Sequence, residues 1–420
     1  MPTPRSIQRT YLVLLLGNTL AASFIWGINT IFLLDAGLSM LEAFAANAFF
    51  TAGMVLFEVP TGVVADTVGR RASYLLGTVT LTAATLLYVL LWQVGAPFWA
   101  WAVVSALLGL GYTFFSGALQ AWVVDALTAS GFTGDMESVF GRGQAVTGAA
   151  MLTGSVAGGL IAQQTNLGVP FVLRGAVLAV MFAVAFKLMR DIGFTPAATG
   201  RPLAAMRQVA SASIDHGWRV PAVKWLMVES LFTGGVAVYG FYALQPYLLE
   251  LYGDPHAYQI AGLSAAIVPG AQMLGGALAT RIRGLFRHRA SALMAMAAAG
   301  AITIGAISLT DSFWAVIGLT VVWGLLFSAT MPIRQAFLND MIPSQQRATI
   351  LSFDSLMSSA GGVWGQPVLG RAADAWGYAP SYAMSAGIAA LGLPFLALSR
   401  RRAVRREGLR TGAALAPQPA

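Results

Sequence analysis

Stretches of about twenty mostly apolar residues recur along the whole chain, and they constrain its fold more than any other feature. A helix needs roughly 20 such residues to cross the hydrocarbon core of a membrane. Only 10% of the residues are charged, whereas soluble domains have about a quarter. The chain therefore lacks the polar residues to cover a water-facing surface, and we predict an integral membrane protein.

The apolar stretches predict an all-α membrane protein with twelve transmembrane helices. No cleavage-site pattern follows the first stretch, so we expect it to remain in the protein as a membrane helix. The predicted spans are 10–34, 42–64, 73–93, 98–124, 143–163, 170–188, 222–249, 258–280, 290–310, 313–337, 348–369 and 376–398.

The Lys and Arg residues concentrate on one side of this topology, at the N-terminus, in alternate loops and in the tail. Only Arg174 and Arg371 fall on the other side, and Arg334 lies within the tenth span. Because cytoplasmic loops carry the excess of Lys and Arg, both termini are predicted to be cytoplasmic. The net charge of +8 then needs no nucleic-acid partner to explain it.

The predicted spans fall into two sets of six. We expect an N-terminal six-helix bundle at 1–188, a cytoplasmic linker with an amphipathic helix at 189–220, and a C-terminal bundle at 221–399. A basic tail, 400–420, is predicted to be disordered. Two six-helix halves related by an axis along the membrane normal are typical of one large class of transporters.

The loop after the second span carries a ten-residue pattern, Gly62-Val-Val-Ala-Asp66-Thr-Val-Gly69-Arg70-Arg71. A glycine allows the tight turn between two antiparallel helices, and arginines at the inner surface anchor it. The pattern, in this loop of a twelve-span chain, resembles the loop 2–3 signature of the major facilitator superfamily. The resemblance covers about residues 8–400 and implies the major facilitator fold and transport by alternating access.

The resemblance also implies a latch at the cytoplasmic side. By position, Asp66 would pair with the inner end of the eleventh span, supported by Arg70 and by Asp125 at the end of the fourth span. A carboxylate at a helix N-terminus is favourable by about 0.3–1 kcal/mol. We assign to the same inner network the following residues: Arg142, Arg347 and Asp354. The alternative is that these are ordinary surface ion pairs.

The fifth span contains a glycine pattern, with Gly141, Gly154, Gly158 and Gly159 at fixed spacing. It is similar to the antiporter motif of drug-efflux members, except for Ala150 in place of Gly and Ser155 in place of Pro. Residues 58–62 and 116–125 also look like the third drug:proton antiporter group. The alternative is a small-residue face that packs helices closely.

Ionisable groups within membrane helices are costly and usually functional. Glu229, flanked by aromatic residues in the seventh span, is the first candidate for proton coupling, and Glu58 is the second. The alternative for Glu229 is a pair with a basic group such as Arg334, and the alternative for Arg334 is snorkelling to the interface. Candidate cavity residues on the spans that line the cavity in this family are Asn18, Asn29, Gln120, Tyr239, Tyr242, Gln245, Trp323 and Arg334.

These features together favour proton-driven antiport that exports hydrophobic or cationic small molecules from an inner membrane. The alternatives are a proton-coupled importer or facilitator of a sugar or small metabolite, a lipid or lysolipid transporter, and a sensor that does not transport. We expect a monomer in contact with lipid. There is no cysteine, no P-loop and no nucleophile–base or metal-ligand pattern, so neither an enzyme nor a cofactor is expected.

Overall fold

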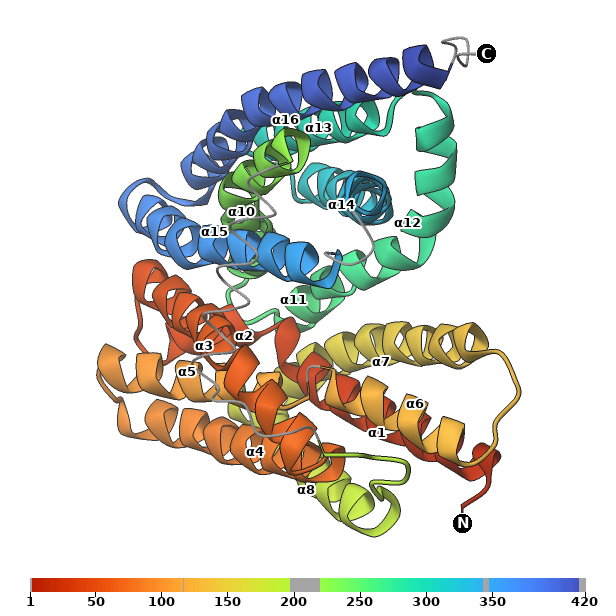
Figure 1. Ribbon diagram of the computed structural model, residues 1–420. Coiled ribbons are helices and arrows are strands. Elements are labelled where there is room, and N and C mark those ends of the chain that lie inside the picture. The colour runs from red at the N-terminus through yellow and green to blue at the C-terminus, as the bar shows by residue number, and fades with distance from the viewer. Residues whose placement is uncertain (1, 116, 197–219, 343–346, 415–420) are drawn as a thin grey trace, which may run out of the picture. The chain divides into compact units, whose positions relative to one another are not determined.

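A computed structural model describes residues 2–115, 117–196, 220–342 and 347–414, and within these ranges every regular element is a helix. Figure 1 shows their arrangement. The helices are α1 (Pro4–Trp26), α2 (Asn29–Asp35), α3 (Met40–Thr67), α4 (Arg70–Val94), α5 (Phe98–Thr113), α6 (Ala118–Ala129), α7 (Met136–Gln164), α8 (Gly168–Leu188), α10 (Pro221–Tyr252), α11 (Tyr258–Ala265), α12 (Ile267–Gly284), α13 (Arg289–Ile307), α14 (Phe313–Met341), α15 (Arg347–Trp376) and α16 (Tyr378–Ala414).

Nine helices or helical runs in the described ranges are long and apolar enough to cross a membrane, and the bent pair of α1 and α2 makes a tenth. Two of the predicted spans have no single matching helix of this kind. The eighth is divided at Ala266 into α11 and α12, and the eleventh, in α15, carries Asp354, Gln366 and several serines. A multi-pass helical membrane protein is confirmed, whereas the number twelve and the orientation of the termini stay predictions.

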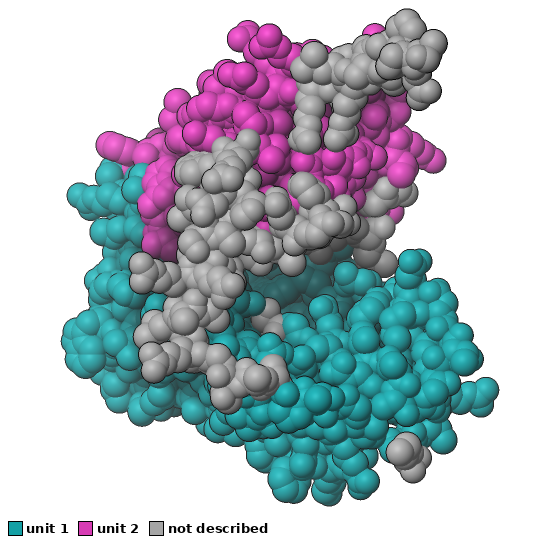
Figure 2. All heavy atoms as spheres, viewed as in Figure 1, with its two compact units in different colours: residues 1–206, 241–270, 366–375 teal, residues 207–240, 271–365, 376–420 magenta. Residues whose placement is uncertain are grey.

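The chain divides into two compact units, coloured separately in Figure 2. Unit 1 comprises residues 1–206, 241–270 and 366–375, and unit 2 comprises 207–240, 271–365 and 376–420. Each unit therefore combines stretches from both predicted bundles. The predicted amphipathic helix in the linker lies largely outside the described residues.

In unit 1, α1 packs along α7 and α8, while α3 and α4 both pack on α5 (Figure 1). Glycines permit this close packing. A Cβ on Gly53 would meet the carbonyl oxygen of Ala106 at 2.6 Å, and one on Gly109 would overlap the carbonyl oxygen of Phe50. Gly53 and Gly109 therefore let α3 and α5 approach closely.

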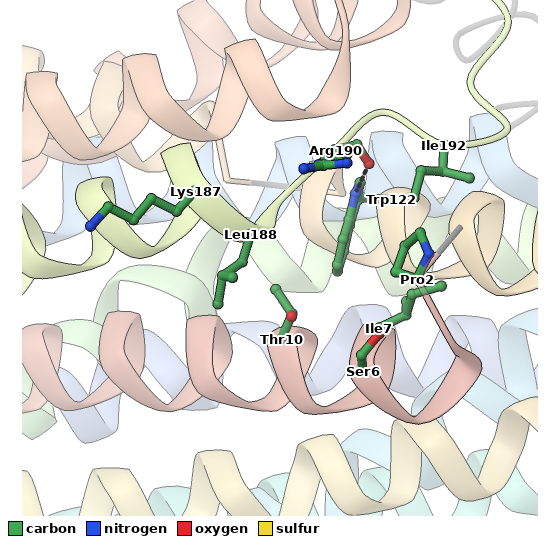
Figure 3. A pocket seen from close by; sticks show the side chains of 9 residues that line it. All are labelled: Pro2, Ser6, Ile7, Thr10, Trp122, Lys187, Leu188, Arg190 and Ile192. Carbon is green, nitrogen blue, oxygen red and sulfur yellow. Dashed lines mark hydrogen bonds between the residues drawn. The ribbon is translucent and has the colours of Figure 1, made fainter.

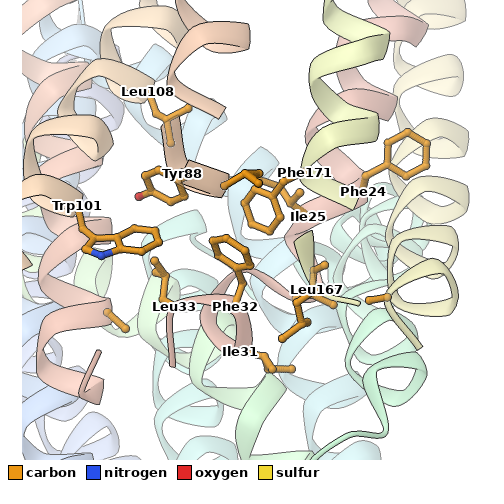
Figure 4. Packing of buried hydrophobic residues seen from close by; sticks show 14 of the residues in the cluster. Phe24, Ile25, Ile31, Phe32, Leu33, Tyr88, Trp101, Leu108, Leu167 and Phe171 are labelled. Atoms are coloured by element: carbon orange, nitrogen blue, oxygen red, sulfur yellow. The ribbon is translucent and has the colours of Figure 1, made fainter. Parts of the chain in front are cut away.

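An aromatic cluster fills the core of unit 1 where α2, α4, α5 and α8 meet (Figure 4). The rings of Phe32 and Phe171 stack with centroids 4.0 Å apart, and Trp101 meets Tyr88 edge to face at 5.0 Å. Stacked and edge-to-face pairs add about 0.5–1.5 kcal/mol each beyond the area that they bury. This core packs against one face of α8 through Phe171.

In unit 2, α13 packs against α14 and α16 (Figure 1). Apolar residues of α10, α13, α14, α15 and α16 form a separate core that includes Met227, Leu293 and Phe337. The tail predicted to be disordered is instead helical as far as Ala414, where it continues α16. Three alanines and no proline within residues 403–414 are consistent with this, because alanine has the strongest helix propensity.

Candidate functional site

A buried cluster of charged residues joins three helices of unit 2. Arg334 of α14 donates to Glu229 of α10 over 2.9 Å and to Asp354 of α15 over 2.6 Å. The same guanidinium donates to the Ser230 hydroxyl and, over 3.2 Å, to the carbonyl oxygen of Leu226. One arginine thus holds two carboxylates and one hydroxyl from neighbouring helices.

This cluster carries a net charge of minus one when all three groups are ionised. The exposed fractions of the side chains are 14% for Arg334, 7% for Glu229 and 15% for Asp354. A charged group in such a place is unfavourable unless it is paired and hydrogen-bonded. One guanidinium cannot neutralise two carboxylates, so the cluster has the capacity for one further positive charge, such as a proton.

The cluster decides between the sequence interpretations of these residues. Glu229 does pair with Arg334, as the alternative interpretation expected, while proton coupling at Glu229 stays a prediction. Snorkelling of Arg334 is wrong, because its side chain is held inside the unit by carboxylates on α10 and α15. Asp354 was assigned to the inner network with Arg347, and its described partners are Arg334 and Ser230; the side chain of Arg347 lies outside the described part.

The charged residues around the loop between α3 and α4 form a local ion-pair network. Asp66 pairs with Arg70, whose Nε lies 3.9 Å from Asp125. The grouping of these residues is confirmed, while the latch with the eleventh span stays a prediction. Gly62 faces open space, and Arg142 is exposed on α7.

The sequence did not reveal Asp191 as part of this motif. Its carboxylate accepts a hydrogen bond of 2.9 Å from the backbone N–H of Arg71, in the first turn of α4. Gly69 makes this possible in two ways: its φ is +128°, and a Cβ at this position would overlap the Asp191 carboxylate. Asp191 thus satisfies one of the four N–H groups that a helix N-terminus leaves unpaired.

The glycines of the antiporter-like pattern on α7 pack against neighbouring helices. A Cβ on Gly154 would lie 2.5 Å from Cβ of Ser23, and one on Gly158 would overlap the carbonyl oxygen of Phe24, both on α1. A Cβ on Gly159 would lie 2.8 Å from Cα of Gly262 on α11, whereas Gly141 faces open space. The small-residue packing alternative thus describes Gly154, Gly158 and Gly159.

A second acid of α15 caps a helix far away in the sequence. Asp374 accepts hydrogen bonds of 2.8 Å from the backbone N–H groups of Met40 and Leu41, the first residues of α3. Ser39 and Glu42 form a capping box at the same helix end. All of these residues belong to unit 1, so this contact is a bridge between sequence segments of the two predicted bundles.

The predicted cavity residues are not all brought together. Asn18 accepts from the Tyr74 hydroxyl, Tyr239 bonds with Ser381, and Gln245 donates to the carbonyl oxygen of Trp26. Gln120 and Glu58 are exposed, and Trp323 lies beside Phe327 in unit 2. Asn29 and Tyr242, in contrast, line one cavity of about 60 Å³ within unit 1.

Arg174 lines the same cavity and was missed by the sequence interpretation, which placed it on the outer side. It lies in the interior of α8, where only 3% of its surface is exposed. The position of Arg174 six residues after the start of α8, in the middle of an apolar segment, was the signal that could have identified it. The cavity is also lined by Asn47, Tyr88 and Tyr112.

A larger cavity of about 330 Å³ lies beside the start of α1 and the end of α8 (Figure 3). The Nε1 of Trp122 donates across it to the carbonyl oxygen of Arg190 over 2.7 Å. Its two cations, Lys187 and Arg190, are exposed and belong to the predicted cytoplasmic face. In the described ranges no three His, Asp or Glu side chains converge as metal ligands.

The fold and these sites define a class of protein: a multi-pass helical membrane transporter. Known proteins agree with this class. The model of the Major Facilitator Superfamily matches residues 11–365 and 285–419, and the chain belongs to that family. No match was found among curated protein sequences.

Solved structures of transporters share the fold. The nucleoside transporter NupG superimposes with a TM-score of 0.79 at 12% identity, covering 95% of this chain and 99% of that one. The POT family transporter PepTSo gives 0.71 at 14% identity, covering 96% and 98%. A bacterial homologue of the human lysosomal transporter Spinster gives 0.72 at 14% identity, with the same coverage. These identities establish the fold and leave the substrate open.

Proposed function

We propose that this protein is a proton-coupled antiporter that exports small, largely apolar organic molecules by alternating access. The single observation that carries the coupling is the cluster of Glu229, Arg334 and Asp354. It is charged, buried in unit 2, and joins α10, α14 and α15. Intramembrane groups of this kind are typical of proton relays in transporters.

Protonation would change this cluster in a defined way. A proton on Glu229 cancels the surplus negative charge and removes an ionised acceptor of Arg334, which then keeps Asp354 and Ser230. The contacts between α10 and α14 would weaken relative to those between α14 and α15. A local change in charge can bias an element that has two packing arrangements, which is how a bound proton would favour one state of the transport cycle.

The direction of transport rests on a different observation. The glycines of the antiporter-like pattern on α7 are present at four of its five positions, and three of them pack tightly on α1 or α11. A plain small-residue interface would pack in the same way, so the proposed antiport rests on the likeness of the glycine spacing to the antiporter motif. The competing functions are import of a sugar or metabolite and transport of a lipid.

The test uses proteoliposomes loaded with a pH-sensitive dye. Cationic dyes, antibiotics, sugars and aromatic carboxylates are added outside in turn. An antiporter drives protons out as its substrate enters, whereas a symporter carries protons in with it. We expect Glu229→Gln to abolish this proton flux but to retain binding of the substrate found. Glu250→Gln, at the exposed end of α10, is the matched control and should transport normally.

Two outcomes would contradict the proposal. Undiminished proton flux in Glu229→Gln would remove the cluster from the coupling mechanism. Proton uptake together with a sugar or metabolite would make the protein a symporter. We further propose that it is monomeric and lies in an inner membrane with both termini cytoplasmic, as the distribution of Lys and Arg predicts.

A further inference from the structure

Arg174 is a buried cation for which the described residues supply no counterion. It is 3% exposed, and its Nε has no hydrogen-bond partner. The ion pairs of the described residues do not include it. Its guanidinium lies over the Tyr112 ring, 5.9 Å from the centroid. An aromatic ring face stabilises a cation only partly, so Arg174 differs from the fully paired Arg334.

A second buried donor without a partner lines the same cavity. Nδ2 of Asn29 donates to Oδ1 of Asn47 over 3.2 Å. This bond fixes the orientation of the Asn47 amide, whose own Nδ2 has no hydrogen-bond partner among the described residues. Both unpaired groups, Nε of Arg174 and Nδ2 of Asn47, are N–H donors. Because buried donors are almost always satisfied, two of them around one cavity point to an acceptor that enters it.

The cavity suits a small anionic group attached to an apolar body. Its volume is about 60 Å³, enough for ordered water or one group of the size of a carboxylate. Its walls include Trp26, Phe50, Tyr88 and Tyr242. Tyr88 and two other wall residues, Ile25 and Leu108, belong to the rigid aromatic core shown in Figure 4. Phe171, one helical turn before Arg174, stacks on Phe32 in that core and fixes this part of α8.

We propose that Arg174 and Asn47 bind the carboxylate of the transported substrate, so that the substrate class is organic monocarboxylates with an aromatic or apolar body. This assignment rests on the proposed transport function and specifies its substrate. It also revises the expected substrate, because a cationic group is repelled by a buried guanidinium at close range. The planar guanidinium is suited to carboxylates, which it can bind through two parallel hydrogen bonds.

The absence of cysteine from the chain permits a test that needs no knowledge of the substrate. Asn47→Cys places a single thiol in the cavity. Its reaction rates with an anionic and a cationic methanethiosulfonate reagent of similar size are measured in proteoliposomes, each divided by the rate for free 2-mercaptoethanol. We expect the anionic reagent to be favoured by about tenfold or more, as a unit charge at close range implies.

Four variants in the same background complete the test. Arg174→Gln should abolish the preference, Arg174→Lys should retain it, and Arg371→Gln, which alters an exposed arginine of α15, should leave it unchanged. Glu229→Gln should also leave it unchanged, so failed proton coupling is distinguishable from failed anion recognition. Equal normalised rates for the two reagents, or no reaction with either, would overturn the proposal even if Arg174→Gln did not fold.

Discussion

Replacing Arg334 by methionine should destabilise the protein more than any other single substitution of an arginine in the described helices. Methionine keeps much of the side-chain volume but removes every donor of the cluster. Glu229 and Asp354 would then be 7% and 15% exposed carboxylates without a cation between them. Breaking a buried ion pair from one side costs about 3–5 kcal/mol, because the remaining charge is uncompensated.

The size of the effect should depend on charge and not on lost packing. We therefore expect the triple variant Arg334→Met, Glu229→Gln, Asp354→Asn to recover most of the lost stability, since the surviving groups are neutral. Replacing a whole buried ion network by hydrophobic residues of similar volume is often close to neutral in free energy, and a buried amide costs less than a buried unpaired charge. Arg371→Met is the control, because this exposed arginine should contribute less than about 0.5 kcal/mol.

The assay is thermal unfolding in detergent, followed by the fluorescence of the eleven tryptophans. We expect the wild type and Arg371→Met to share the highest melting temperature and the triple variant to melt slightly below them. Arg334→Met should melt several degrees lower than all of these. The reasoning is refuted if Arg334→Met melts with the wild type, because the cluster is then solvated. It is also refuted if the triple variant melts as low as the single one, because packing and not charge would then be responsible.

Three further substitutions test the packing contacts. Gly158→Ala should cost about 1–3 kcal/mol, because its Cβ would overlap the Phe24 carbonyl oxygen, while Gly141→Ala, which faces open space, should be neutral or stabilising in the same thermal assay. Gly69→Ala should cost about 1–3 kcal/mol because of its φ of +128°; equal melting of Gly69→Ala and Gly62→Ala would contradict the role given to Asp191. Asp374→Asn should weaken the contact of α15 with α3. The measurement is the alkylation rate of a single cysteine introduced at Thr51, which Gln366 of α15 contacts at 3.4 Å, and this rate should rise. An unchanged rate would show that the cap does not hold these segments together.

The sequence alone was enough to predict the family because its strongest signals are local. Apolar runs of fixed length and the spacing of Gly62, Asp66, Gly69 and Arg70 can be read without any tertiary information. The pair of Asp66 and Arg70, one helical turn apart, follows from that spacing. The division of the eighth span at Ala266 had a local signal that the prediction did not use: Pro269 lies in the first turn of α12, and a proline cannot donate the backbone hydrogen bond that would continue the preceding helix.

Contacts between distant segments were harder to predict. Asp191 caps α4 from 120 residues away, and Asp374 caps α3 from more than 330 residues away. A carboxylate that caps a helix in its own first turn leaves a local pattern, as Ser39 and Glu42 do here. One that arrives from another helix leaves none, because its position depends on how the helices pack.

The two intramembrane arginines show why position within a span does not determine a role. Arg334 and Arg174 both interrupt apolar helices, and on insertion scales both carry a similar cost of about 2.5–3.5 kcal/mol. In unit 2 that cost is offset by two acids, Glu229 and Asp354. In unit 1 the described residues provide Arg174 only with an aromatic face and a cavity. The carboxylates that balance Arg334 can take up a proton. Arg174 lacks a counterion and is therefore suited to bind the anionic group of a ligand. The division of roles proposed here, with proton coupling at Glu229 and recognition of a carboxylate at Arg174, follows from that difference.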